Sequence, residues 1–207
     1  MLAIFKREFK SYFQNVIGWL FVAALLAVYG LYFYVYNLKN GYPYISYDLK
    51  GIGFIMMIAV PILTMRSLSD EKKTKTDQLM LTSPVSVGRI VAGKYLAMAA
   101  VYTIDIALFA LSPLVLSIYG KVALSEAYVA LFGYWLYGLS CIAVGLFISS
   151  ISESVIISAI LTFAALFLSY MMQSITGLIS SSGNLLTKVL NLSLIHISEP
   201  TRLRCIS

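Results

Sequence analysis

Apolar residues gather in long runs along this chain, and shorter charged or aromatic stretches separate the runs. A helix needs roughly 20 residues to cross the hydrocarbon core of a bilayer, and these runs reach or approach that length. Five spans are predicted, at Val16–Tyr36, Gly51–Met65, Tyr95–Tyr119, Tyr128–Ile148 and Val155–Met172. The second run is short, and Pro61 within it predicts a kink. The pattern predicts an all-α membrane protein that forms a polytopic helical bundle.

Composition agrees with this fold class, because 60% of the residues are hydrophobic and only 12% are charged. A soluble domain carries about 25% charged residues. The net charge is +6, but the basic residues cluster at the ends of the apolar runs rather than along one soluble face. They are better interpreted as topology signals than as a nucleic-acid surface, so no nucleic-acid partner is expected.

Lysine and arginine counts predict the orientation, because cytoplasmic loops of membrane proteins carry an excess of these residues. A cytoplasmic N-terminus places nine of them inside, and only four outside. The inside set is Lys6, Arg7, Lys10, Arg66, Lys72, Lys73, Lys75, Arg89 and Lys94, and the outside set is Lys39, Lys50, Lys121 and Lys188. We therefore predict a multi-pass membrane protein with its N-terminus in the cytoplasm.

The first residues combine an apolar and a basic pattern at helical spacing. The apolar positions are Leu2, Phe5, Phe9 and Phe13, with Lys6, Arg7 and Lys10 between them. This is typical of an amphipathic helix that lies in the membrane interface, so the lipid bilayer is a predicted partner. The alternative is a plain basic flank to the first span. Val16–Tyr36 is too long for a signal-peptide core, so we expect that span to stay uncleaved.

Tyrosines surround the first loop and predict an aromatic belt at the membrane surface, although a sugar- or choline-binding surface is the alternative. They are Tyr32, Tyr34, Tyr36, Tyr42, Tyr44 and Tyr47.

The segment Arg66–Lys94, called the insert below, carries nine of the chain's 24 charges between two apolar runs. Such a segment cannot lie in hydrocarbon, so it must face water. Within it, Asp70–Thr82 is predicted to be a helix that Ser69 or Asp70 caps and Pro84 stops. Its apolar end, Leu79–Leu81, suits docking in a groove of a soluble partner. A solvated loop is the alternative.

The sequence contains no P-loop, H-E-x-x-H or G-x-S-x-G motif and no His/Cys cluster, so a membrane enzyme is poorly supported. Asp105 is the ionisable residue deep in a span, which makes it a candidate for a polar path. The interpretation favoured here is a hydrogen bond to Tyr102, Thr103 or a hydroxyl of a neighbouring helix. Small residues of the fourth span, among them Gly138 and Gly145, predict close helix packing.

The last residues, 192–207, differ in character from the rest. Leu192–Arg202 resembles the conceptual translation of a sequencing adapter, so residues 192–207 are predicted to be a non-native tail. The native domain would then be a C-terminally truncated region, residues 1–191. Five spans with a cytoplasmic start leave the C-terminus outside, which fits a missing sixth helix.

Several motifs together resemble the cytoplasmic signature of type-two ABC exporter permeases. In the insert they are Arg66, Glu71, Lys72, Thr76-Asp77, Leu79, Leu81, Thr82-Ser83-Pro84-Val85 and Gly93-Lys94. Residues 147–153, Phe-Ile-Ser-Ser-Ile-Ser-Glu, are similar to the family's short turn between the fourth and fifth spans. The Tyr-rich loop and the N-terminal segment resemble the Gld permease branch, which is associated with gliding motility.

This resemblance implies a six-span permease subunit of the bacterial inner (cytoplasmic) membrane. The subunit would export a substrate and assemble as a homodimer or with a second permease. ATP and Mg²⁺ would bind to a separate ATPase subunit, and this chain would hold no cofactor and no metal. Asp70–Thr82 would be the coupling helix, with coupling residues Arg66, Asp70, Glu71, Thr76, Asp77, Leu79, Leu81 and Pro84, and Glu153 would mark a second contact. The alternative function is a stand-alone channel or secondary carrier that uses Asp105.

Overall fold

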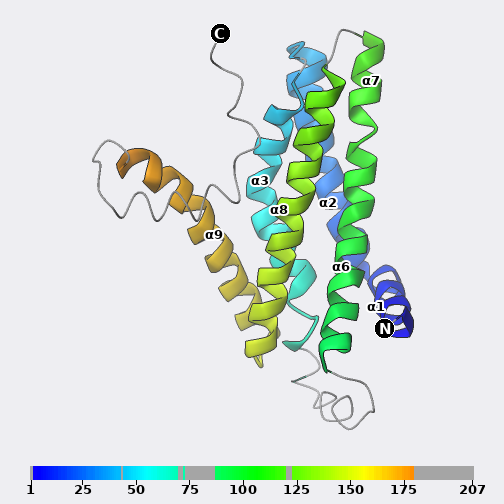
Figure 1. Cartoon of the computed structure of the whole chain (residues 1–207), viewed down its shortest axis with the longest axis vertical. Helices are drawn as coiled ribbons and strands as arrows, with labels where there is room; N and C mark the ends of the chain where they lie inside the picture. The colour runs from blue at the N-terminus through cyan, green and yellow to red at the C-terminus, as the bar shows by residue number, and fades with distance from the viewer. Residues whose placement is uncertain (1, 43, 70–71, 73–86, 120–122, 180–207) are drawn as a thin grey trace. The chain divides into compact units, whose positions relative to one another are not determined.

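The computed structural model describes residues 2–42, 44–69, 72, 87–119 and 123–179. Every regular element in this part of the chain is helical, which confirms the all-α prediction. The elements are α1 (Leu2–Gln14), α2 (Val16–Phe33), η1 (Tyr34–Lys39, a π-helix), α3 (Ser46–Thr64), α6 (Val87–Phe109), α7 (Ser112–Tyr119), α8 (Leu124–Ile151) and α9 (Val155–Ile179) (Figure 1). The chain divides into two compact units, Met1–Phe163 and Ala164–Ser207. In the second unit the described residues are the remainder of α9.

Four segments among the described residues are long and apolar enough to cross a membrane, which confirms a multi-pass membrane protein. They are Val16–Lys39, Val87–Ile118, Leu124–Ile151 and Val155–Met172. The remaining predicted span, Gly51–Met65, corresponds to α3, a 19-residue helix with Asp48 in its first turn. Because α3 is not among the four segments, its passage through the membrane stays a prediction.

The third predicted span differs from the structure at its start. Helix α6 begins at Val87 rather than Tyr95, so the last part of the predicted water-facing insert belongs to this helix. Lys94, at the end of the insert, is only 2% exposed. Partners on other elements satisfy its ammonium group, as described below.

The same predicted span is also not one continuous helix. Helix α6 ends at Phe109, and α7 begins at Ser112. Pro113 explains the break, since proline lacks the N–H that would continue the helical ladder. The hydroxyl of Ser112 bonds to the Phe109 carbonyl at 2.7 Å and also contacts the Tyr29 hydroxyl, so α2 holds this junction.

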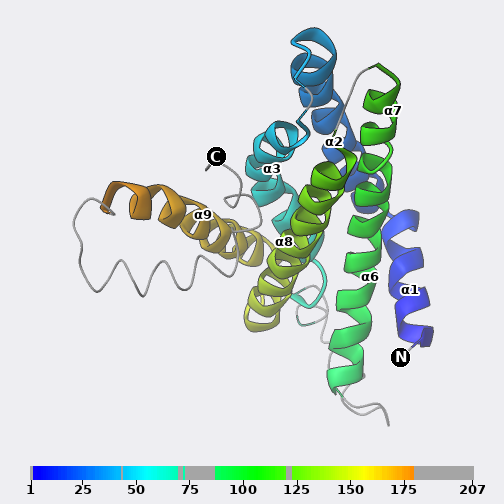
Figure 2. The same ribbon diagram turned by 45° about the horizontal axis from the view of Figure 1, so that its top comes forward.

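Helices α2, α3, α6 and α8 form a closed ring, in which α2 and α8 each pack against both α3 and α6 (Figures 1 and 2). Each helix contributes side chains to the core between them. Leu25, Met56, Met98 and Ile142, one from each helix, are at most 1% exposed. Helix α1 packs against α6 and α2.

Small residues on α8 permit close approach to its neighbours, as predicted. A Cβ atom at Gly138 would overlap the ring of Tyr102 on α6, and one at Gly145 would overlap the side chain of Thr64 on α3. The Tyr102 hydroxyl donates to the backbone carbonyl of Tyr134 on α8 at 2.8 Å. Close packing and a buried hydrogen bond therefore fix α6 against α8, as is common between membrane helices.

Candidate coupling site at the root of the insert

The predicted coupling residues fall partly inside and partly outside the described chain. Arg66 lies in the turn after α3, Glu153 lies between α8 and α9, and both are exposed. The others lie outside the described residues: Asp70, Glu71, Thr76, Asp77, Leu79, Leu81 and Pro84. The predicted coupling helix itself, Asp70–Thr82, therefore stays a prediction, and the site is built here from the residues that lead into it.

We call residues 66–69 together with Lys72 the insert root. Helix α3 ends at Thr64, and the chain then turns, with the Ser67 N–H bonding to the Thr64 carbonyl at 3.1 Å. The Lys72 N–H bonds to the Leu68 carbonyl at 3.1 Å. Ser67 and Ser69 are buried whereas Arg66 is exposed, so the root presents one face to the bundle and one to its surroundings.

Ser149, in the last turn of α8, is the main partner of the insert root. Its hydroxyl oxygen accepts the backbone N–H groups of Leu68 and Ser69, each at 3.2 Å. The Ser69 hydroxyl lies 2.9 Å from the Ser149 hydroxyl and 3.3 Å from the Ser149 carbonyl oxygen. Both serines are 0% exposed. Since buried backbone N–H groups need partners, this contact fixes the root to α8.

A second contact joins the root to the same end of α8. The ammonium group of Lys72 donates to the backbone carbonyl of Ser150. Helix α8 ends at Ile151, with Ser152 as an extended C-cap, so the Ser150 carbonyl has no later turn of α8 to bond. A cation is favourable at this negative end of a helix. Lys72 therefore stabilises the end of α8 and holds the root there.

Lys94 joins the root to α6 and α1. Its ammonium nitrogen donates to the Ser67 carbonyl at 2.8 Å and lies 3.5 Å from Glu8 Oε1 on α1. The side chain of Lys94 is 3% exposed and that of Glu8 is 16% exposed, so little water screens this pair. The adjacent Gly93 lets α1 approach, because a Cβ atom there would press against Ile4. One buried cation thus connects the insert root, α6 and α1.

The ends of α6 and α8 also line an open apolar hollow of about 550 Å³ beside the insert root. Its walls include Leu68 of the root, Val91 and Tyr95 of α6, and Leu146 and Phe147 of α8. Beside this hollow the root bonds to α8 through Ser149 and to α6 through Lys94, and Tyr95 of α6 also donates directly to the Leu139 carbonyl of α8 at 3.2 Å. A displacement of the root would therefore act on both helices.

The sequence model of the ABC-2 family transporter proteins matches residues 11–193, which is most of the chain. The chain belongs to the ABC-2 transporter family. It is therefore the membrane subunit of an ABC-type transporter, and permeases of this family work with an ATP-binding subunit. No curated protein and no solved structure gives a significant match to the chain.

The root of this permease brings together motifs that lie far apart in its sequence. The residues after Arg66, the turn motif at residues 147–153 and the Gly93-Lys94 pair meet within one set of hydrogen bonds. Sequence reasoning did not find Glu8, Ser67 or Ser69 as members of this set. The available signal was Lys94, whose charge inside an apolar helical pattern requires an acidic or carbonyl partner. The sequence alone does not say which partner meets it.

Asp105 lies in α6 of the permease, is 0% exposed, and neither carboxylate oxygen has a hydrogen-bond partner among the described residues. The expected hydrogen bonds to Tyr102 and Thr103 are absent there. Tyr102 donates to the Tyr134 carbonyl, and Thr103 donates to the Ala99 carbonyl at 2.7 Å. Both hydroxyls therefore bond to backbone carbonyls instead. The interpretation that Asp105 forms a hydrogen bond to one of these hydroxyls was wrong. No group of His, Cys, Asp and Glu within the described residues could hold a metal ion.

Proposed function

We propose that this permease exports a substrate by receiving mechanical work through its insert from a separate ATPase subunit. Family membership supports an ABC-type transporter, and the geometry of the insert root supports this route of coupling. The observation that carries the proposal is the attachment of the root to α8 through Ser149 and to α6 and α1 through Lys94. ATP and Mg²⁺ would bind to the ATPase partner.

The physical argument concerns what happens when a partner pushes on the insert. Each neutral hydrogen bond of the root contributes about 0.5–1.5 kcal/mol, and a bond to a charged group contributes about 1.5–3 kcal/mol. Several such bonds must break together before the root separates from α8 and α6. The root therefore moves with the helix ends, and a rigid connection of this kind can pass a displacement to the bundle.

The arrangement of basic elements supports a bacterial inner-membrane location with a cytoplasmic N-terminus. Helix α1 lies at the same end of the bundle as the insert root and the start of α6 (Figure 1). Lys6, Arg7 and Lys10 are exposed on α1, and Arg89 is exposed on α6. An excess of such residues on one side identifies the cytoplasmic face. We also propose a six-span subunit that pairs with a second copy or a second permease.

A finer assignment, to the Gld branch associated with gliding motility, rests on the Tyr-rich first loop and the basic N-terminal helix. Deletion of the gene in its host should then abolish colony spreading, and the intact reading frame should restore it. Normal spreading of the deletion strain would contradict this assignment while leaving the transporter proposal intact.

The coupling proposal is tested by co-expressing the permease with its ATP-binding partner subunit. Glu71→Lys combined with Leu79→Asp alters the insert and should reduce co-purification of the ATPase. Ser149→Ala removes the acceptor of the Leu68 and Ser69 N–H groups, so it should preserve co-purification but lower the permease-dependent stimulation of ATP hydrolysis. Ser140→Ala is the matched control, because this exposed α8 serine donates to the Tyr137 carbonyl of its own helix at 2.7 Å and does not contact the insert root.

Two outcomes would contradict the coupling proposal. One is full co-purification of the ATPase with the Glu71→Lys, Leu79→Asp variant. The other is unchanged stimulation in the Ser149→Ala variant. The alternative function, a carrier that uses Asp105, would be supported by ion flux in liposomes without ATP that Asp105→Asn abolishes. Family membership does not favour that alternative.

A further inference from the structure

Helix α1 has three chemically different faces, and two of them already have partners. Its inner face holds Ile4, which meets Gly93, and Glu8, which pairs with Lys94. These contacts fix how α1 is rotated against α6. The remaining faces therefore have defined directions, which the sequence pattern alone could not give.

The second face is a row of aromatic rings. The centroids of Phe5 and Phe9 are 5.8 Å apart, and those of Phe9 and Phe13 are 5.0 Å apart. The row continues to Trp19 in the first turns of α2, whose ring meets Phe13 edge-on at 5.3 Å and whose indole N–H donates to the Phe13 carbonyl at 2.9 Å. Trp19 is 60% exposed. An exposed tryptophan at the start of a membrane span marks the level of the lipid headgroups.

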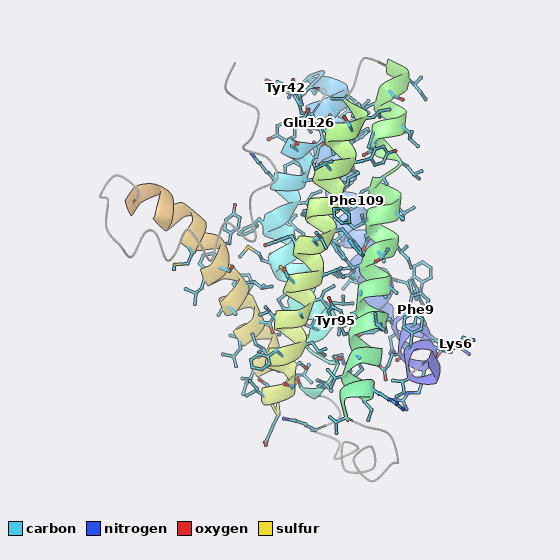
Figure 3. All side chains as sticks on the ribbon, in the orientation of Figure 1. Lys6, Phe9, Tyr42, Tyr95, Phe109 and Glu126 are labelled. Atoms are coloured by element: carbon cyan, nitrogen blue, oxygen red, sulfur yellow. The ribbon has the colours of Figure 1, made fainter. Side chains whose placement is uncertain are left out.

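The third face is basic. Lys6, Arg7 and Lys10 are exposed, and Figure 3 shows Lys6 at the outer side of α1, away from α6. Lys6 and Lys10 make no ion pair with the described residues, and Arg7, whose side chain is 63% exposed, contacts only the neighbouring Glu8. Glu8 is the acidic residue of α1, and it also serves Lys94 on the inner face. The outward charge of α1 is therefore positive.

We propose that the basic face of α1 binds the headgroups of anionic phospholipids in the adjoining leaflet. The aromatic row and Trp19 place α1 at headgroup level, where lysine and arginine side chains meet lipid phosphates. Charge complementarity selects lipids with a net negative headgroup over zwitterionic ones, since each basic residue near an anionic surface adds attraction.

An acidic surface of a protein partner would be the other occupant of a basic face. The membrane is favoured because the aromatic row lies on the same short helix as the three basic residues. A soluble protein that covered the basic face would have to approach at the depth of Trp19. Lipid headgroups lie at that depth in any bilayer, so binding them needs no further assembly.

The test uses Trp19 as a reporter in the reconstituted full chain. The chain has two tryptophans, so Trp135→Phe leaves Trp19 as the only one. Vesicles contain equal amounts of phosphatidylglycerol and phosphatidylcholine, with brominated, fluorescence-quenching chains on either one lipid or the other. We expect the relative binding constant to favour phosphatidylglycerol by about threefold, and about 1 M salt should reduce this preference towards unity because it shortens the screening length.

Variants then assign the preference to α1. Lys6→Gln, Arg7→Gln and Lys10→Gln together should remove it. Lys39→Gln with Lys50→Gln, which alters exposed lysines beyond the far end of α2, should leave it unchanged. Equal quenching by both lipids in the Trp135→Phe protein would overturn the proposal. So would a preference that high salt does not reduce, or one that survives the triple substitution. The salt arm needs no substitution on α1, so it decides the matter even if the triple variant misfolds.

Discussion

Replacement of Lys94 by Met tests the polar connection between α6, α1 and the insert root. Met keeps most of the length of the lysine side chain but removes its charge. The substitution deletes the 2.8 Å hydrogen bond to the Ser67 carbonyl and leaves Glu8 without the cation that lies 3.5 Å away. The Ser67 carbonyl and the Glu8 carboxylate would then lack that partner in a region that little water reaches.

The size of the effect follows from two opposing contributions. The hydrogen bond from a charged donor contributes about 1.5–3 kcal/mol, and loss of one member of a buried ion pair can cost about 3–5 kcal/mol. Removal of a buried ammonium group also recovers its desolvation cost, which reduces the net change in unfolding free energy. The pairwise coupling between Lys94 and Glu8 is therefore more informative than either single substitution, and we expect it to be about 1–3 kcal/mol.

The assay is a double-mutant cycle of Lys94→Met and Glu8→Gln, measured by reversible unfolding of the purified protein in mixed micelles with tryptophan fluorescence as the signal. The control cycle pairs Arg7→Gln with Glu8→Gln. Arg7 lies 3.0 Å from the same carboxylate, but its side chain is 63% exposed, so its coupling should stay below about 1 kcal/mol. A Lys94–Glu8 coupling no larger than that of the control would refute the reasoning.

Two further predictions concern helix packing and pH. Gly138→Ala should lower the unfolding free energy by about 1–3 kcal/mol, because the added Cβ would displace the Tyr102 ring. The control is Gly30→Ala, which should be neutral or stabilising because a Cβ there meets open space. Equal effects of the two substitutions in the same unfolding assay would contradict this prediction. Asp48 precedes the predicted span at Gly51, and burial raises its pKa from 3.8 to about 6 although a hydrogen bond from Asn37 lowers it. The contribution of Asp48 to the unfolding free energy is therefore fully present below about pH 4. It is lost as the pH rises through about 6, which lowers the unfolding free energy by about 2–3 kcal/mol. Unfolding measured from pH 4 to pH 8 should show that Asp48→Asn removes this part of the decrease, and an unchanged profile would be the contrary result.

Apolar length was sufficient to predict much of the fold. The starts of the first and last predicted spans, Val16 and Val155, coincide with the starts of α2 and α9. At both places a polar stretch precedes a long apolar run, so local pattern and tertiary structure agree. Pro113 also indicates a break between α6 and α7, although the predicted span Tyr95–Tyr119 was continuous across it.

The sequence could not predict features that depend on distant partners. The charge of Lys94 near the end of an apolar run did not indicate which groups would meet it, and Glu8 and the Ser67 carbonyl allow it to be buried. The π-helical turn at Tyr34–Lys39 places Asn37 against Asp48 of α3, a pairing that no local periodicity encodes. The attachment of the insert root to α8 could likewise not be predicted from the sequence, because Ser69 and Ser149 are 80 residues apart.

The most direct test of the account asks which side of the membrane the insert faces. Lys73→Cys, in a background without Cys141 and Cys205, places one thiol in the insert directly after its root. A membrane-impermeant maleimide should label this thiol in inverted inner-membrane vesicles and should leave it unlabelled in intact cells. Labelling from the outside of intact cells would put the insert beyond the reach of any cytoplasmic ATPase and would contradict the coupling mechanism.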